Sequence, residues 1–352
     1  MSMRNPSVTL GIVTAPSAKA SDTRTVLTVE NLQTHIKSPQ GVARVVDGVS
    51  FTIGRGRTLA VVGESGSGKT MLARSIMGLV PEPPGIRAGG RVLFEKQDLR
   101  TLPERDLSRI RGRDIAMVFQ DPMTSLNPVI RIGEQIAEVL RQHLKMGRAR
   151  ARERALELLK AVGMPSPEQR LDEYPHQLSG GLRQRVVIAI ALACKPKLLI
   201  ADEPTTALDV SIQAQILRLL KKYQREDDMA MIFVSHDLGT VAGLADDIAV
   251  MYAGRIVEYG PAQEVLNAPR MPYTEALLRS IPRMDAPSHT RLHTIEGRPP
   301  VLTELPEGCA FSTRCPYAET RCGTTRPTLT ADSHAYACWF PCAVSAEQEI
   351  AQ

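Results

Sequence analysis

The chain has 352 residues, and its 43 lysines and arginines against 38 aspartates and glutamates give a formal net charge of +5 with neutral histidines. Its 43% hydrophobic and 23% charged residues exclude a disordered, collagen-like or coiled-coil protein, and the length is typical of about two structural units. A basic excess this small is more typical of ordinary solubility than of a nucleic-acid surface, so we expect no nucleic-acid partner.

The N-terminal residues 1–24 are rich in Ser, Thr, Ala and Pro, and their apolar stretch Val8–Val13 is broken by Thr9 and Gly11. This composition predicts a flexible tail and not a signal peptide. The longest uninterrupted apolar run, Val186–Cys194, has nine residues, whereas a membrane-spanning helix needs about 20. We therefore expect that the chain does not cross a bilayer.

Short apolar runs separated by glycines predict strands in the first part of the chain. The predicted strands are Val26–Asn31, Val42–Val46, Val49–Ile53 and Thr58–Val62. A helical pattern follows at Thr70–Leu79.

Apolar residues at helical spacing between Gly133 and Val162 predict a helical insert in the middle of the chain. Strand and helix then alternate, which favours a parallel α/β sheet. The predicted elements are helices at Leu182–Ala193 and Ser211–Tyr223 and strands at Lys197–Ala201 and Met229–Val234.

Residues 63–70, which follow the strand that ends at Val62, match the phosphate-binding loop G-x-x-x-x-G-K-[ST] at every fixed position. Glycines let backbone N–H groups surround phosphates, and the following helix adds a partial positive charge. In such a loop Lys69 reaches the β- and γ-phosphates and the Thr70 hydroxyl binds Mg²⁺. The predicted ATP-binding residues are Gly63, Glu64, Ser65, Gly66, Ser67, Gly68, Lys69 and Thr70.

A pair of carboxylates, Asp202 and Glu203, follows a buried strand. Such a pair alone is more often a solvated strand end. Next to a phosphate-binding loop, however, it supplies what nucleotide hydrolysis requires. We expect Asp202 to bind Mg²⁺ through water and Glu203 to act as the general base.

Residues 178–185, LSGGLRQR, resemble the signature motif of the ATP-binding cassette (ABC) family. In that family two cassettes associate head to tail, and each signature closes over the ATP held by the other cassette. Without the resemblance, Ser-Gly-Gly before a helix would be an ordinary helix cap. The resemblance implies a P-loop NTPase fold with a RecA-like parallel sheet, an antiparallel β subdomain and a helical subdomain. It also implies that ATP is contacted in trans by Ser179, Gly180, Gly181 and Gln184.

Three further positions match ABC motifs in the expected order. Gln120 matches the Q-loop glutamine, which contacts Mg²⁺ and the attacking water, and Asp209 matches the D-loop aspartate. His236 matches the switch histidine, which contacts the γ-phosphate, although a lone histidine after a strand is usually structural. The family usually stacks adenine on an aromatic residue near the first strand, and only His35 is available there.

Three further strings narrow the resemblance: Gln120–Pro128, Pro272–Leu278 and Gly308–Pro316, with Met271 in place of the usual histidine. Within the family they resemble the ATP-binding subunits of bacterial dipeptide and oligopeptide importers. Relatives in this subfamily also carry nickel chelates, glutathione or opines, so the cargo stays open.

A soluble ABC ATPase of DNA repair or translation is a further alternative. Gln120 and Ser179 are only 59 positions apart, however, which is too close for the long coiled coil of the repair proteins.

The last part of the chain contains the cysteines Cys309, Cys315, Cys322, Cys338 and Cys342. Their spacing leaves an iron-sulfur cluster, zinc and free thiols open. In the peptide-importer subunits the corresponding four cysteines hold a 4Fe-4S cluster. The resemblance therefore assigns this role to the first four, with Cys342 as a rival for the last position.

The expected organisation is a tail (1–24), an ABC cassette (25–265) with a helical subdomain at about 121–181, and an irregular cysteine-rich extension (266–352) that acts apart from the nucleotide site. The resemblance implies an ATPase on the cytoplasmic face of the bacterial inner membrane. Its partners would be two transmembrane permease subunits, a second cassette in a heterodimer and, indirectly, an extracytoplasmic binding protein.

Overall fold

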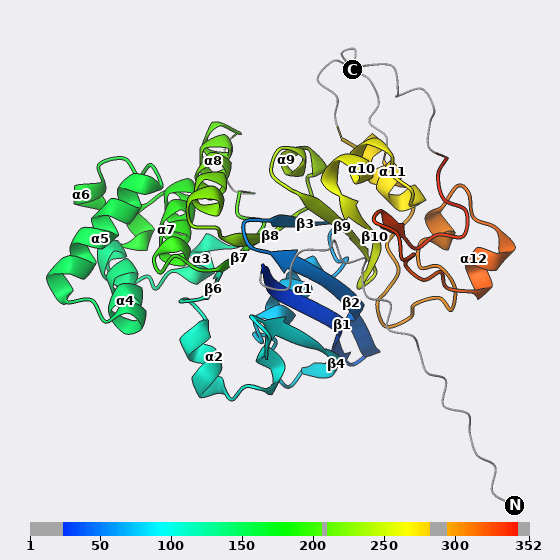
Figure 1. Cartoon of the computed structure of the whole chain (residues 1–352), viewed down its shortest axis with the longest axis horizontal. Coiled ribbons are helices and arrows are strands. Elements are labelled where there is room, and N and C mark those ends of the chain that lie inside the picture. The colour runs from blue at the N-terminus through cyan, green and yellow to red at the C-terminus, as the bar shows by residue number, and fades with distance from the viewer. Residues whose placement is uncertain (1–23, 206–209, 282–293, 344–352) are drawn as a thin grey trace, which may run out of the picture.

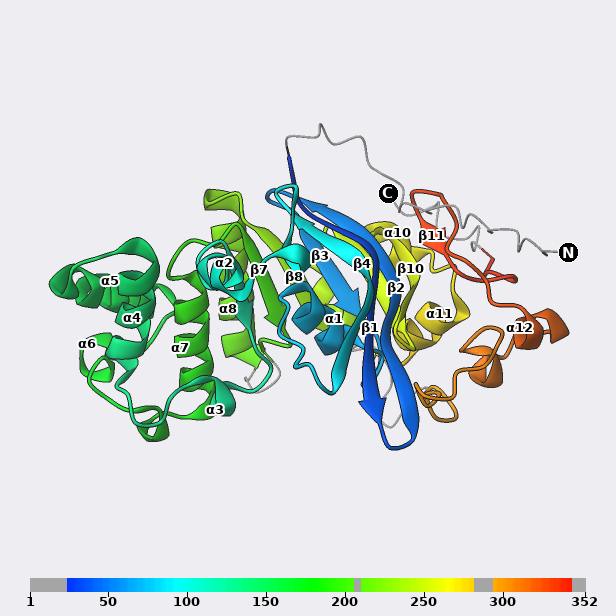
Figure 2. The same cartoon turned by 90° about the horizontal axis from the view of Figure 1, so that it is seen from below.

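The computed structural model describes residues 24–205, 210–281 and 294–343. A region of helices lies at one end, two sheets lie in the middle, and residues 294–343 lie at the other end, as both cartoon views show (Figures 1 and 2). The predicted tail lies outside the described residues except for Arg24. Within these ranges no helix is both long and apolar enough to cross a membrane.

The central sheet has seven strands in the order β11-β10-β9-β3-β8-β7-β6. Strands β9, β3, β8, β7 and β6 run parallel to one another. At one edge β10 pairs antiparallel with β9, and β11 pairs antiparallel with β10. Their apolar runs are buried, which is typical of parallel strands covered on both faces. The bounds are β3 Thr58–Val62, β6 Ile115–Val118, β7 Leu198–Asp202, β8 Ala230–Ser235, β9 Asp247–Tyr252, β10 Arg255–Pro261 and β11 Ala335–Tyr336.

A second, antiparallel sheet has the order β2-β1-β4-β5. The prediction of separate strands at Val42–Val46 and Val49–Ile53 is wrong, because both belong to one strand. Gly48 between them has a φ of +79° and is skipped in the pairing with β1, so it forms a bulge and not a turn. The bounds are β1 Thr25–Ser38, β2 Gly41–Gly54, β4 Gly85–Phe94 and β5 Gln97–Asp98.

Helix α1 (Lys69–Ile76) packs its buried residues Leu72 and Ile76 into a core that both sheets share. The predicted helical insert is present as two helices, α4 (Ile132–Leu144) and α5 (Arg148–Ala161), which are separated at Lys145 by a left-handed φ of +56°. The other helices are α2 Glu104–Ile110, α3 Pro122–Ser125, α6 Pro167–Arg170, α7 Gly180–Leu192, α8 Val210–Glu226, α9 Leu238–Ala242, α10 Ala262–Asn267, α11 Pro272–Arg279 and α12 Thr320–Thr324, with 3-10 turns at Leu99–Thr101, Pro175–Gln177 and Ser312–Arg314.

The C-terminal region is tied to the central sheet by strand β11, which pairs with β10. Beside this pair, the fully buried carboxylate of Glu258 on β10 accepts hydrogen bonds from the backbone N–H groups of Arg270 (2.6 Å) and Met271 (3.1 Å). The Nε2 atom of His334 lies 2.7 Å from the same carboxylate. One side chain therefore holds the start of α11 and the segment before β11.

We expect Glu258→Ala to lower the free energy of unfolding by about 3 kcal/mol, because it leaves buried donors without an acceptor. Urea titration of the full-length chain measures the loss. Glu264→Ala is the matched control, since Glu264 lies 3.8 Å from the other ring nitrogen of His334 with a side chain that is 51% exposed. Glu264→Ala should lower the free energy of unfolding by less than about 1 kcal/mol. Equal losses in the two variants would contradict the assigned role.

Candidate nucleotide site

The loop between β3 and α1 has the backbone that a phosphate-binding loop requires. Gly63 and Gly68 have φ values of +150° and +105°, which residues with a side chain rarely adopt. A Cβ atom on Gly63 would lie 2.2 Å from the carbonyl oxygen of Met251, and one on Gly68 would lie 2.3 Å from that of Val45. Only glycine fits at either position, because the loop lies against β9 of the central sheet at Met251 and against β2 of the second sheet at Val45.

Inside this loop, the Lys69 ammonium donates hydrogen bonds to the carbonyl oxygens of Gly63 (2.8 Å) and Glu64 (2.9 Å). Burial lowers the pKa of Lys69, and the nearby carboxylates of Glu203 and Asp202 oppose that shift. The hydroxyl of Ser67 is buried without a hydrogen-bond partner among the described residues. The Lys69 ammonium and the unpaired Ser67 hydroxyl therefore lie beside the N-terminus of α1, where both could bind the phosphates of a nucleotide.

The Thr70 hydroxyl donates to Oδ1 of Asp202 at 3.2 Å, at the end of β7. Asp202 is 1% exposed, and burial raises its pKa while the hydrogen bond from Thr70 opposes the rise. A hydroxyl and a carboxylate side by side are the hard oxygen ligands that Mg²⁺ prefers. These two residues therefore fit the predicted magnesium site.

Three side chains from the ends of three neighbouring strands meet at Glu203. The amide of Gln120, after β6, donates to Oε2 of Glu203 at 3.0 Å, and Nδ1 of His236, after β8, lies 3.2 Å from Oε1. Glu203 itself has a left-handed φ of +46°, a conformation that non-glycine residues adopt mainly at constrained sites. The structure thus brings together the predicted base, Q-loop glutamine and switch histidine.

The signature residues lie on α7, which packs against α3, α4 and α5. Ser179 is the N-cap residue and makes no side-chain capping bond, and both it and Gly180 are exposed. Both are therefore open to solvent in this structure. Gly181 is half-buried, and Gln184 is 2% exposed with no partner for either amide atom among the described residues.

Two other predicted residues are not part of this cluster. His35 lies in β1, where it pairs with Ile86 of β4, and its Nε2 atom is buried without a partner within the described chain. Its contact with adenine stays a prediction. Asp209 lies outside the described residues.

The extension, which we expect to act apart from the nucleotide site, contacts the phosphate loop. Arg314 donates to both carboxylate oxygens of Glu64 in the phosphate loop, at 2.6 and 2.9 Å. The backbone N–H of Glu64 donates to the Tyr273 hydroxyl at 2.8 Å. Sequence reasoning missed both contacts, although Tyr273 and Arg314 lie within two of the strings that carry the resemblance to peptide importers.

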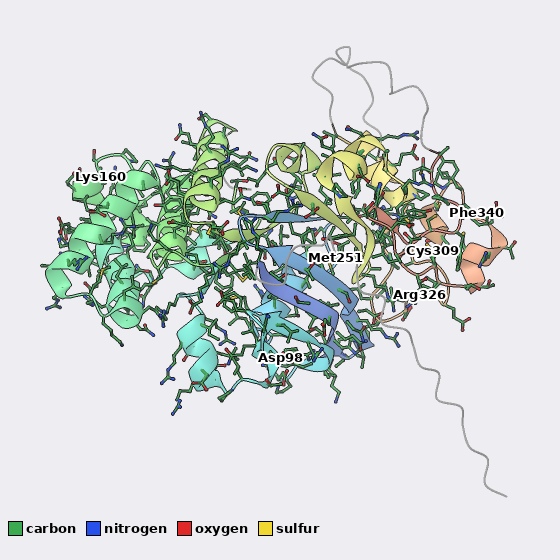
Figure 3. All side chains as sticks on the ribbon, in the orientation of Figure 1. Asp98, Lys160, Met251, Cys309, Arg326 and Phe340 are labelled. Atoms are coloured by element: carbon green, nitrogen blue, oxygen red, sulfur yellow. The ribbon has the colours of Figure 1, made fainter. Side chains whose placement is uncertain are left out.

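Cys309, Cys315, Cys322 and Cys338 line one small cavity in the C-terminal region. In Figure 3, Cys309 lies near Arg326 and Phe340, across the sheets from Lys160 of the helical region. Burial raises the pKa of Cys338 to about 11. Backbone N–H groups at Phe311, Tyr317 and Phe340 oppose the corresponding rise at Cys309, Cys315 and Cys338 respectively, as donors to thiolate sulfur do.

Thiolates are the ligands that an iron-sulfur cluster takes, and four cysteines line this one cavity. No group of three or more His, Cys, Asp or Glu side chains in the described chain is arranged to hold one metal ion. Cys342 lines a different cavity, and its thiol donates to Glu275 at 3.5 Å.

Two family models match the chain. The ABC transporter model matches residues 46–206, and the model of the C-terminal region of oligopeptide/dipeptide transporters matches residues 257–322. The dipeptide transport ATP-binding protein DppD of Bacillus subtilis is 49% identical over 90% of this chain and 94% of its own length. The oligopeptide transport ATP-binding protein OppD of Escherichia coli is 49% identical over 86% and 89%.

Among solved structures, a dimeric ATP-binding cassette in a post-hydrolysis state with ADP and Pi matches with a TM-score of 0.62 and 29% identity, over 67% of this chain and 98% of that one. The fold and the convergent site therefore define an ABC-type ATPase. The chain belongs to the ABC transporter family, and within it to the ATP-binding subunits of the oligopeptide and dipeptide transporters.

Proposed function

We propose that this chain binds and hydrolyses ATP for a bacterial importer of peptides or related small solutes. The observation that carries the proposal is geometric: Thr70 of the phosphate loop bonds to Asp202, and Gln120 and His236 contact Glu203. The C-terminal region of the same chain matches that of peptide transporters. The names of the relatives, which describe dipeptide and oligopeptide transport, support a peptide cargo over nickel chelates, glutathione or opines. We place the chain peripherally on the cytoplasmic face of the inner membrane.

The phosphates of ATP would lie against residues 63–70, with Lys69 between the β- and γ-phosphates. Thr70 and Asp202 would hold Mg²⁺, with Gln120 as a further ligand. The ion, when bound, neutralises charge on the phosphate oxygens. Glu203 takes a proton from the attacking water, and Gln120 and His236, which contact its two carboxylate oxygens, keep it directed toward the γ-phosphate.

A second cassette completes the site in this proposal, because the exposed Ser179 lies on α7 and is available to a partner's ATP. We propose a heterodimer that works on two permease subunits and receives cargo from a binding protein. The cassette would span 25–265, with its helical subdomain at about 121–181, and the extension 266–352.

The test is ATP-dependent uptake into proteoliposomes that contain the assembled transporter and its binding protein. Labelled dipeptides and longer peptides should be taken up, and uptake should cease with Lys69→Ala. Uptake of a nickel chelate or glutathione alone would reject the peptide cargo. ATP hydrolysis that needs no membrane partner would favour a soluble ATPase.

The segment Met123–Pro128 after Gln120, together with the helical insert, is our proposed groove for a cytoplasmic helix of the permease. Its Met123 is 61% exposed and the adjoining Val129 is 77% exposed, and Arg183 of α7 contacts the Met123 sulfur. Interaction surfaces often contain exposed apolar side chains, so the exposure of these two side chains supports this choice of segment. The segment therefore joins the Q-loop glutamine Gln120 to this surface and contacts the signature helix α7.

We expect a photo-crosslinking residue at Met123 or Val129 to capture a permease subunit in the assembled transporter. The same residue at Val301, a 63% exposed apolar position in the extension, is the matched control and should not. Crosslinks to the permease from Val301 alone would contradict the proposed surface.

We also propose that Cys309, Cys315, Cys322 and Cys338 hold a 4Fe-4S cluster. The cavity that these four cysteines share, with Cys342 elsewhere, supports this choice of ligands. When bound, the cluster would cross-link a region that has little regular secondary structure of its own.

A further inference from the structure

The C-terminal region contacts the phosphate loop through one residue, Glu64. The guanidinium of Arg314 forms a bidentate pair with its carboxylate, at 2.6 and 2.9 Å. The Arg314 side chain is 2% exposed and that of Glu64 is 25% exposed, so this pair is largely shielded from solvent. Bidentate pairs fix orientation as well as charge.

The position of Arg314 is itself firmly held. It donates to the backbone carbonyl oxygens of Glu296 (2.9 Å) and Ile295 (3.3 Å) and to the Tyr252 hydroxyl (3.3 Å). The hydrogen bonds to Glu64 raise its pKa, so it stays charged. Arg314 is thus an anchored cation that faces the loop.

A second contact reaches the backbone of the same residue. Tyr273 is completely buried and packs against the rings of Tyr252 and Phe311, with centroids 4.5 and 5.3 Å away. Its hydroxyl accepts the backbone N–H of Glu64. Because three aromatic rings pack together here, the hydroxyl has little freedom to move.

Glu64 also contacts Lys69, the lysine of the phosphate loop. Its carbonyl oxygen accepts a hydrogen bond from Lys69 at 2.9 Å. Its carboxylate is a negative charge on the loop that has to hold anionic phosphates, and Arg314 neutralises it. Loss of Arg314 would leave that charge to repel ATP.

We infer that Arg314 and Tyr273 are positioning residues for the phosphate loop, and that through Glu64 they set its affinity for the phosphates of ATP. The inference rests on the proposed ATP binding at residues 63–70. It predicts an effect on ATP affinity and KM, with little effect on kcat, because neither residue touches the reacting atoms.

We expect Arg314→Gln in the full-length chain to weaken binding of a fluorescent ATP analogue about tenfold. In the assembled transporter it should raise KM for ATP to the same degree and leave kcat within about twofold. Adding Glu64→Gln should restore affinity to within about threefold of the wild type, since it removes the charge that lost its partner. Arg314→Lys, which keeps the charge but not the bidentate geometry, should fall between.

Arg326→Gln is the matched control. This arginine is also partly buried in the extension. It donates to the carbonyl oxygens of Pro306 and Gly308 and lies 3.9 Å from Asp47 of β2. Because none of these residues belongs to the phosphate loop, its loss should leave ATP affinity unchanged. Unchanged affinity in Arg314→Gln, or a loss that Glu64→Gln does not relieve, overturns the inference. If Arg314→Gln does not fold, unchanged affinity in Arg314→Lys overturns it. Failure of the proposed function looks different, because the wild type and Lys69→Ala would then bind ATP equally poorly.

Discussion

Glu203→Gln should lower steady-state ATP turnover of the assembled transporter at least about a hundredfold while ATP affinity stays within about threefold. The substitution keeps the size of the side chain but removes its ability to accept a proton from water. It leaves Lys69, Thr70 and Asp202 unchanged, so binding of the phosphates and Mg²⁺ should be retained.

The geometry explains why no neighbour should replace Glu203. The Gln120 amide cannot accept a proton from water. His236 has a side chain that is 55% exposed, against 13% for Glu203, so it is not enclosed in the site as Glu203 is. The variant should therefore retain ATP and accumulate as a closed cassette pair, which size-exclusion chromatography with nucleotide analysis measures. Glu226→Gln, an exposed glutamate of α8, is the control and should not change turnover. A fall in turnover of less than about tenfold would show that Glu203 is not the base.

Residues adjacent in sequence could be predicted because their chemistry depends on local structure. The phosphate loop follows a strand and precedes a helix, and Asp202 and Glu203 end an apolar strand, so both were placed by pattern alone. Gln120 and His236 carry no such pattern. The family resemblance supplied their roles, and the pairing of β6, β7 and β8 brings both to Glu203.

Long-range pairing was the part that the sequence did not reveal. The strands β4, β5, β6, β9, β10 and β11 are not predicted from the sequence, and two predicted strands are one because Gly48 forms a bulge. Arg314 and Glu64 are 250 positions apart, and nothing in either local sequence indicates the other. Such contacts depend on how β10, β11 and the cysteine-rich extension pack against the phosphate loop. A hydrophobic periodicity over a few residues carries no information about this long-range packing.

Cys322→Ser should abolish iron binding, from about four irons per chain in the anaerobically purified wild type to less than about one. Cys322 is 7% exposed, and its carbonyl oxygen accepts the backbone N–H of Cys309 at 2.7 Å, so two of the proposed ligands are joined directly. A serine hydroxyl there is a poor replacement for a thiolate. Iron analysis and the brown absorbance of the protein measure the loss.

The fourth ligand is decided by comparing Cys338→Ser with Cys342→Ser. Cys338 lines the shared cavity, whereas the Cys342 thiol donates to Glu275, so only the first variant should lose iron. Stoichiometric zinc without iron in the wild type would reject the cluster, and iron loss from Cys342→Ser alone would reassign the ligand. Because Cys315 directly follows Arg314, loss of the cluster should also weaken ATP binding, by no more than Arg314→Gln does. A larger loss would mean that the cysteines hold up the whole extension and not this one contact.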